Sequence, residues 1–316
     1  MFGLLESLSF SSPVFSTSGR GRGATFAPPH CKESRRYIPD WEMSRLFEVK
    51  TLKSVLIKSC FEVIKPYIKE ANIVVTKECI KMSAKDSLNT SITYLCLDAA
   101  KFESYHCTGT FVFGVDTNLF FKALKSASRS DVIVMYMDAD SPDKLVIELA
   151  NTMYGRTKEC TLKTLQLDAT DYSIADLSYD YSINMPTGLF QQIVKDIQIF
   201  EGKTVEITSV GKQLIFKCND GLVPEYKTVV NELEDTLTQA QKDILKQNKE
   251  ESRSVWFSQT SQDIAQGRFS VSNLVHFSKA AHLCDSMELC IGNDKPLALI
   301  FYVASLGEMR FILVQS

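Results

Sequence analysis

This 316-residue chain repeats one local pattern four times. Each copy runs from a strand of alternating residues, through a polar start signal, into a short amphipathic helix. The copies are "LFEVKTLKSVLIKSCFEVIKPYIKE" (46–70), "FVFGVDTNLFFKALKSAS" (111–128), "YSINMPTGLFQQIVKDIQ" (181–198) and "RFSVSNLVHFSKAAHL" (268–283). The succession of strand, helix and run of strands occurs before residue 160 and again after residue 181. The sequence therefore predicts an internal duplication into two similar domains.

Ten further segments have the alternation and the β-branched or aromatic residues of strands. They cover residues 72–77, 91–98, 131–139, 144–150, 159–168, 204–210, 213–219, 287–292, 296–304 and 309–316. Strands that follow one another without helices between them indicate antiparallel sheets. The predicted class is α+β, with sheet predominating.

The four predicted helices each have an apolar face and a polar face that carries lysine. The apolar face is formed by Phe120, Phe121, Leu124 and Ala127 in the copy at 111–128, and by Ile57, Phe61, Ile64 and Ile68 in the copy at 46–70, as expected for helices packed on a core. The lysines on the polar faces are Lys58, Lys65, Lys122, Lys125, Lys195 and Lys279. For any one helix, an ordinary solvated face explains the lysines. Four such helices together favour a shared basic strip.

Charge and cysteine content limit the class of protein. The formal net charge of −3 argues against a surface that is basic throughout, but it allows a local basic strip. The nine cysteines are scattered without a C-x-x-C pair or zinc-ligand spacing, and no signal sequence accompanies them. We expect reduced thiols in a soluble cytosolic or nuclear protein, with no metal and no cofactor. No apolar run approaches the length of a membrane-spanning helix.

The first 45 residues differ from the rest of the chain. They are rich in Ser, Gly, Pro and Arg and lack a sustained apolar period, so we predict a disordered extension. A transit peptide has a similar composition, and a tail or an upstream start ahead of Met43 is the simpler explanation. The folded part is expected to begin around Leu46.

Five ordered stretches resemble the proliferating cell nuclear antigen family of eukaryotic and viral DNA sliding clamps. They are "FEVKTLKSVLIKSCFEVIK", "FESYHCTGTFVFGV", "LQLDATDYSI", "YSINMPTGLF" and "LGEMRFILV". The resemblance implies clamp domains at 46–160 and 181–316, joined by a connector at 161–180. It also implies that three chains close into a ring with pseudo-six-fold symmetry, with helices inside and sheets outside.

The same resemblance implies a processivity factor that encircles duplex DNA. The six lysines would face the phosphates without reading sequence, because phosphate contacts position a protein but do not specify a site. Ser272 departs from the family, which usually has arginine there. The implied partners are double-stranded DNA, two further copies of the chain, DNA polymerase, a clamp loader and PIP-box-type peptides, with no membrane involved. The implied location is the nucleus, or the replication site of a virus.

A partner-peptide pocket is implied beside the connector. Carried across by position, it includes Ile92, Tyr172, Ile174, Pro296 and Ile312. The family usually has leucine at Tyr172, proline at Ala175 and an apolar residue at Lys85. These departures predict a partner preference that differs from that of a cellular clamp.

Ring closure is implied to pair a strand near 155–163 with one near 222–230 of the next subunit. An insert at about 231–252 follows the second strand. In it, Leu233, Leu237, Ala240 and Ile244 recur at spacings of four, three and four, which predicts a short amphipathic helix. The insert either packs on its own domain or alters the subunit interface.

Two alternatives compete with a homotrimeric clamp. Catalysis is disfavoured because His30, His106, His276 and His282 form neither a triad pattern nor a metal-ligand helix, so we expect no enzyme and no catalytic residues. A subunit of a heteromeric checkpoint-type clamp is the nearer alternative. The connector and the closing strand favour the replicative clamp, whereas the insert and the altered pocket keep the alternative open.

Overall fold

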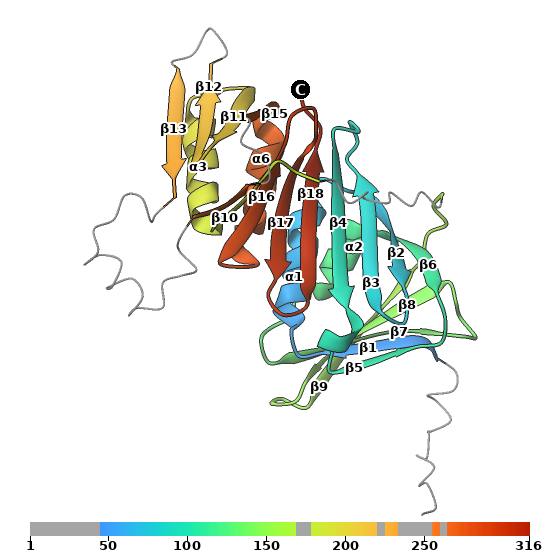
Figure 1. Ribbon diagram of the computed structural model, residues 1–316. Helices are drawn as coiled ribbons and strands as arrows, with labels where there is room; N and C mark the ends of the chain where they lie inside the picture. Colours follow the sequence, from blue (N-terminus) through green and yellow to red (C-terminus); the bar gives the residue numbers. More distant parts are fainter. Residues whose placement is uncertain (1–44, 169–177, 220–224, 233–254, 260–263) are drawn as a thin grey trace, which may run out of the picture. The chain divides into compact units, whose positions relative to one another are not determined.

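The computed structural model describes residues 45–168, 178–219, 225–232, 255–259 and 264–316 (Figure 1). All of them belong to the larger of two compact units, Asp40–Ser316. The first 44 residues and the predicted insert helix lie outside the described residues. No helix in the described part of the chain is long and apolar enough to cross a membrane.

The first half of the described chain contains nine strands and two α-helices. In order, its elements are β1 (Arg45–Thr51), α1 (Ser54–Ile64), β2 (Glu70–Val75), β3 (Cys79–Lys85), β4 (Ser91–Asp98), the 3-10 helix η1 (Ala99–Lys101), β5 (Ser104–Cys107), β6 (Phe111–Asp116), α2 (Thr117–Leu124), β7 (Asp131–Asp138), β8 (Lys144–Asn151) and β9 (Arg156–Lys163).

The second half follows the same succession of strand, helix, strands, helix and strands. Its described elements are β10 (Tyr181–Pro186), α3 (Thr187–Ile199), β11 (Thr204–Val210), β12 (Gln213–Cys218), β13 (Tyr226–Asn231), β14 (Trp256–Gln259), β15 (Ala265–Ser270), α6 (Val271–Phe277), the 3-10 helix η3 (Ser278–His282), β16 (Ser286–Ile291), β17 (Leu297–Val303) and β18 (Gly307–Leu313). The predicted α+β class is therefore confirmed.

The described strands form three antiparallel sheets, with orders β5-β1-β7-β8-β9, β14-β10-β16-β17-β18-β4-β3-β2-β6 and β13-β12-β11-β15. The nine-stranded sheet joins the two halves, because β18 pairs with β4 and sets Ile312 opposite Ile92. Gly307 allows this pairing: a Cβ there would lie 2.0 Å from the carbonyl oxygen of Cys96. A larger residue at this position would push the two strands apart.

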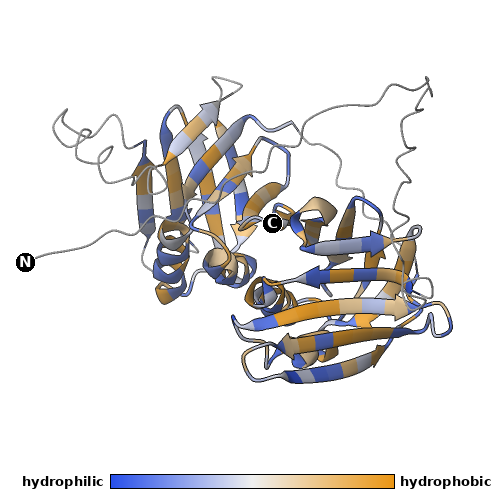
Figure 2. Ribbon diagram, turned by 90° about the horizontal axis from the view of Figure 1, so that it is seen from below, coloured by the Kyte–Doolittle hydropathy of each residue, from blue (hydrophilic) through white to orange (hydrophobic). Residues whose placement is uncertain are grey.

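Alternation in the sequence explains the strands. In β4, Ser91, Thr93, Leu95 and Leu97 are buried while the residues between them are more exposed, as the two faces of a pleated strand require. Figure 2 shows the same alternation as bands of hydrophobic and hydrophilic residues along the strands. The core between sheets and helices is apolar, and its fully buried side chains include Phe47, Tyr181, Phe190, Phe216 and Phe277.

The predicted strand at 159–168 was wrong at both ends. β9 begins at Arg156 and ends at Lys163. Beyond it, Leu165 makes a single two-bond bridge to Gly114 (N–O distances 2.8 and 2.9 Å). The Leu167 side chain lies close to β6, since a Cβ on Gly114 would lie 2.7 Å from it. Alternation alone does not separate a paired strand from an extended segment crossing a sheet.

Other predicted bounds also shifted. The helices in the first two copies end at Ile64 and Leu124, before Ile68 and Ala127, although both of these residues are buried as predicted. The strands β3, β5 and β14 were not predicted. β3 has the sequence "CIKMSAK" with a single β-branched residue, and β5 and β14 have four residues each, so their local signals are weak.

Candidate nucleic-acid interface and partner site

Three of the four lysine-bearing helical segments begin at a buried hydroxyl side chain. Each hydroxyl donates to a carbonyl just beyond the end of a neighbouring helix. The pairs are Ser54 with Ser128 (2.6 Å), Thr117 with Ile68, and Thr187 with Cys284 (2.7 Å). The fourth helix starts at Val271, whose backbone N–H donates to the carbonyl of Lys203 at 3.0 Å. The start of each helix is therefore bonded to the chain beyond the end of a neighbouring helix. These bonds set the orientation of the polar faces of both helices.

The helices form one connected group. α1 packs against α2 and contacts η3, while α3 packs against α6 and η3. Phe61 and Phe120 stack with ring centroids 4.0 Å apart, which joins α1 to α2. Across the two halves, the Tyr67 ring meets His276 edge-on at 4.3 Å, and its hydroxyl donates to the carbonyl of Asn273. In Figure 1, α1 and α2 lie behind the nine-stranded sheet, on the opposite side from the viewer.

All six predicted lysines lie on this helical group, and four of them are exposed: Lys122, Lys125, Lys195 and Lys279. Lys122 belongs to α2, whose opposite face buries Phe120, Phe121 and Leu124. Lys195 belongs to α3 and donates to the Gln191 side chain at 3.3 Å. These lysines therefore lie on the polar sides of helices whose apolar sides pack on the core.

The other two lysines, Lys58 and Lys65, are half-buried and have partners within the protein. The Lys58 Nζ donates to the carbonyl of Ala127 at 3.3 Å, which links α1 to the chain after α2. The Lys65 Nζ lies 3.3 Å from the centroid of the Phe121 ring, a cation–π contact. Both side chains therefore also stabilise the contact between α1 and α2.

His276 adds no positive charge to the group at neutral pH. Burial, and secondarily the positive charge of Lys279, lower the pKa of its imidazole. The helical group therefore depends on lysine for its charge. Ser272, where the family usually has arginine, is exposed on α6.

Two of the strands that lie at sheet edges among the described residues are β9 and β13. β9 is the last strand of the five-stranded sheet, and β13 is the last strand of the four-stranded sheet. These are the strands predicted near 155–163 and 222–230. Each has one long side without a described partner, which makes it suitable for pairing with another chain.

A second apolar cluster lies on the face of the nine-stranded sheet away from the main core. Cys290, Ala298 and Ile312 are buried in it, and Ile92, Tyr179 and Ile300 pack against them. Burial, reinforced by the charge of Glu288, raises the pKa of the Cys290 thiol to about 12. This thiol is therefore neutral, and the cluster behaves as an apolar surface. We call these six residues the apolar patch.

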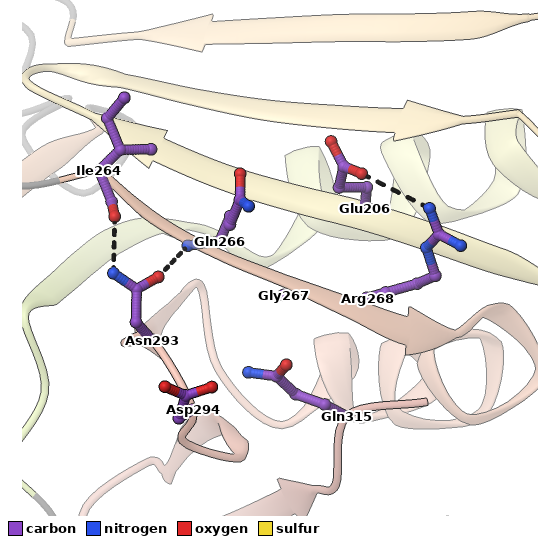
Figure 3. Close-up of a pocket in the computed structure, with 8 residues that line it drawn as sticks. All are labelled: Glu206, Ile264, Gln266, Gly267, Arg268, Asn293, Asp294 and Gln315. Atoms are coloured by element: carbon purple, nitrogen blue, oxygen red, sulfur yellow. Dashed lines mark hydrogen bonds and ion pairs between the residues drawn. The ribbon is translucent and has the colours of Figure 1, made fainter.

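A polar cavity of about 680 Å³ lies between β15, β11, the β16–β17 turn and the chain end. Figure 3 shows its lining, which includes the ion pair of Glu206 and Arg268 at 3.7 Å. Asn293 spans one side: its Nδ2 donates to the carbonyl of Ile264, and its Oδ1 accepts from the backbone N–H of Gln266. The cavity mixes donors and acceptors. In the described part of the chain, no group of three or more His, Cys, Asp or Glu could hold a metal ion.

Comparison with known proteins places these features in a family. The family of proliferating cell nuclear antigen N-terminal domains matches residues 46–172, and that of the C-terminal domains matches residues 173–316. The chain belongs to the proliferating cell nuclear antigen family. The two matched regions meet at residue 172 and together cover the whole described chain except Arg45.

Similar proteins of the family come from a virus and from eukaryotes. "Probable DNA polymerase sliding clamp 1" of Paramecium bursaria Chlorella virus 1 is 25% identical over 271 residues, covering 85% of this chain and 96% of the viral protein. "Proliferating cell nuclear antigen" of Caenorhabditis elegans is 25% identical over 273 residues, with the same coverage. The protein of that name from Chaetomium thermophilum is 24% identical over 269 residues, covering 85% of this chain and 97% of the relative.

In this member of the proliferating cell nuclear antigen family, part of the predicted partner pocket is brought together by the fold. Ile92 and Ile312 face each other across β4 and β18 and belong to the apolar patch. Pro296 is half-buried just before β17 but is not a member of the patch. Tyr172 and Ile174 lie outside the described residues.

Four residues of the apolar patch in this family member were not predicted from the sequence. Tyr179, Cys290, Ala298 and Ile300 complete the apolar patch, but they come from separate segments. Their alternation along β16 and β17 indicates two buried faces, which was the available signal. The polar start signals were predicted, but the bonds from three of their hydroxyls to carbonyls beyond the neighbouring helices were not.

Proposed function

We propose that three copies of this chain close into a ring around duplex DNA and keep replication enzymes on their template. The chain is a DNA sliding clamp, in agreement with its family and the names of its relatives. One observation carries the proposal for DNA: all six lysines lie on a single connected helical group. A group of helices with cationic outer faces suits the repeated phosphates of a duplex.

Such a surface binds without selecting sequence. Lysines attract phosphates, and the observed binding constant falls with salt with a slope of about −0.9 per phosphate neutralised. The protein then needs no contact with base edges, so it is free to move along DNA. The closed ring, rather than tight binding, would keep it there.

Ring closure is proposed through β9 of one subunit and β13 of the next. Two different edges on one chain give a head-to-tail contact, and such contacts form a closed ring when the rotation between neighbours allows it. Strand pairing across the contact would extend each sheet and cover both edges. The insert between β13 and β14 follows this edge directly along the chain.

The proposed partners are DNA polymerase, a clamp loader and PIP-box-type peptides, with the apolar patch as part of the peptide site. We place the protein in the nucleus, or at the site of viral replication if a virus encodes it, since its relatives are eukaryotic and viral. The proposed role is tethering without catalysis. No observation favours a heteromeric checkpoint-type clamp over the homotrimer.

A threading experiment tests encirclement without a loader. The protein is incubated at low salt with a linear duplex that carries biotin at both ends, streptavidin is added to block the ends, and salt is then raised. We expect the protein to stay with the blocked duplex on a sizing column, because charge attraction is screened at high salt while a ring remains linked.

Two controls accompany the threading experiment. The protein should leave the DNA when the ends are left open, and when a restriction enzyme cuts the blocked duplex. Equal release from blocked and open DNA would contradict encirclement.

A further inference from the structure

The turn between β16 and β17, Gly292–Lys295, contacts three segments that are distant in sequence. These are the end of the connector at 178–180, the start of β15, and the chain end after β18. Asp294 adopts a left-handed conformation in the turn, with φ of 56°. We call Gly292–Lys295 the clasp.

The clasp binds the connector end through three polar contacts. The Lys295 Nζ donates to the carbonyl of Ser178 at 2.6 Å and lies 3.6 Å from Asp180 Oδ1. The backbone N–H of Asn293 donates to Asp180 Oδ2 at 3.3 Å. A Cβ on Gly292 would lie 2.6 Å from the same oxygen, so glycine is needed for the carboxylate to approach.

The clasp is itself anchored on its other sides. The Asn293 Nδ2 donates to the carbonyl of Ile264 at 2.8 Å, and the backbone N–H of Gln266 donates to Asn293 Oδ1 at 3.0 Å. The Gln315 Nε2 donates to the carbonyl of Lys295 at 3.0 Å. The clasp is therefore held by the start of β15 and by the chain end, independently of its contacts with the connector end.

The residue between the two clasped positions is Tyr179. Its ring packs against Cys290, Ala298 and Ile312 in the apolar patch. Burial raises the pKa of its hydroxyl to about 12, as expected for a ring held against an apolar surface. Ser178 and Asp180, on either side of it, are the two connector residues that the clasp holds.

We propose that the clasp is a positioning device for the partner site: Lys295 holds the Ser178 carbonyl on one side of Tyr179, Lys295 and the Asn293 backbone N–H hold the Asp180 carboxylate on the other, and together they fix the Tyr179 ring on the apolar patch. This inference rests on the proposed function, since it concerns the site where partner peptides would bind. Lys295 acts through the connector end and is a positioning residue. The side chains of Lys295 and Asp180 are 30% and 29% exposed, so the ion pair is partly protected from solvent.

The test compares Lys295→Met, Lys295→Arg and Asp180→Asn in the full chain. The probe is a fluorescent PIP-box-type peptide, and binding is read by anisotropy. Lys295→Met keeps the aliphatic stem but removes the charge, and we expect the peptide Kd to rise about fivefold. Lys295→Arg should restore binding to within about twofold of the unmodified chain, because arginine retains donors and charge. The double variant Asp180→Asn/Lys295→Met should lose less than the sum of the two single effects.

A matched control is Lys144→Met, an exposed lysine that also stands beside a turn but in another sheet. It should leave peptide binding unchanged. Hydrogen exchange provides the second measurement: the amides at 179–181 should exchange faster in Lys295→Met than in Lys144→Met, with equal thermal midpoints.

Each outcome decides something different. If the unmodified chain binds the peptide and Lys295→Met binds it equally well, the positioning role is overturned while the partner site stands. If the unmodified chain does not bind the peptide, the partner site itself is overturned, and the role with it. Equal loss of binding in Lys295→Arg and Lys295→Met would also contradict a role that depends on charge and donors.

Discussion

Thr161→Pro is expected to convert the assembled protein into monomers. Thr164, just after β9, donates its backbone N–H to the carbonyl of Asp143, just before β8. Successive N–H groups along a strand alternate in direction, so the N–H of Thr161 points away from β8, towards the open edge. Proline there removes one outward donor and leaves the bonds to β8 intact. The loss, about 2 kcal/mol at each contact, is repeated at all three contacts of a ring. Sedimentation velocity at micromolar concentration should show a single-chain species.

The matched control is Thr161→Val, which keeps the N–H and the strand preference and should remain assembled. Val229→Pro tests the opposite edge. The backbone N–H of Glu232 donates to Lys212, so the N–H of Val229 also points outward from β13. An assembled Thr161→Pro protein with an unchanged sedimentation coefficient would contradict closure through β9.

Reversing the exposed lysines of the helical group is expected to abolish DNA binding. The variant replaces Lys122, Lys125, Lys195 and Lys279 with glutamate. Their side chains extend from the outer faces of the helices, and Lys58 and Lys65 are left in place because they also stabilise the contact between α1 and α2. With the attraction turned to repulsion in every subunit, affinity for a linear duplex should fall at least about a hundredfold at low salt. Anisotropy across a salt series measures this.

The control changes the same amount of charge elsewhere. It replaces four exposed lysines outside the helical group with glutamate: Lys77, Lys81, Lys101 and Lys144. This variant should bind DNA within about threefold of the unmodified chain and with the same salt slope, because those positions lie off the helical group. Equal losses in the two variants would mean that overall charge, and not the helical group, determines binding.

Much of the architecture could be predicted from periodicity. The four strand-and-helix copies are present, and all ten predicted strand segments overlap observed strands. Alternation and amphipathic spacing indicate which residues are buried, because the side chains that face the core are apolar. This is why Ile68 and Ala127 were correctly predicted as buried although they lie beyond the ends of their helices.

Apart from the strands with weak local signals, the prediction failed where contacts between distant residues decide the structure. β9 ends at Lys163 because the chain then crosses to Gly114, and nothing local to 164–168 signals that crossing. Lys58 and Lys65 were predicted on a polar face by the same helical spacing as Lys122. Their partners, Ala127 and Phe121, belong to α2 and the residues just after it, so the spacing did not reveal them. The spacing of lysines identifies the polar face of a helix, but it does not show which lysines contact other parts of the protein.

The partner site shows the same limit. Ile92 and Ile312 could be assigned by resemblance, and pairing of β4 with β18 then brings them together. The clasp could not be predicted, since it depends on Lys295 reaching Ser178 across 117 positions of sequence. Short polar turns give local signals for the turn itself, and none for what the turn binds.

The central claim, that this chain closes on itself into a ring, is tested most directly by the solution mass of the unmodified protein. Light scattering behind a sizing column measures that mass without reference to shape. A mass about three times 35.5 kDa, constant across the micromolar range, is the predicted result. The mass of a single chain throughout that range would contradict the account and would leave the heteromeric clamp as the better explanation.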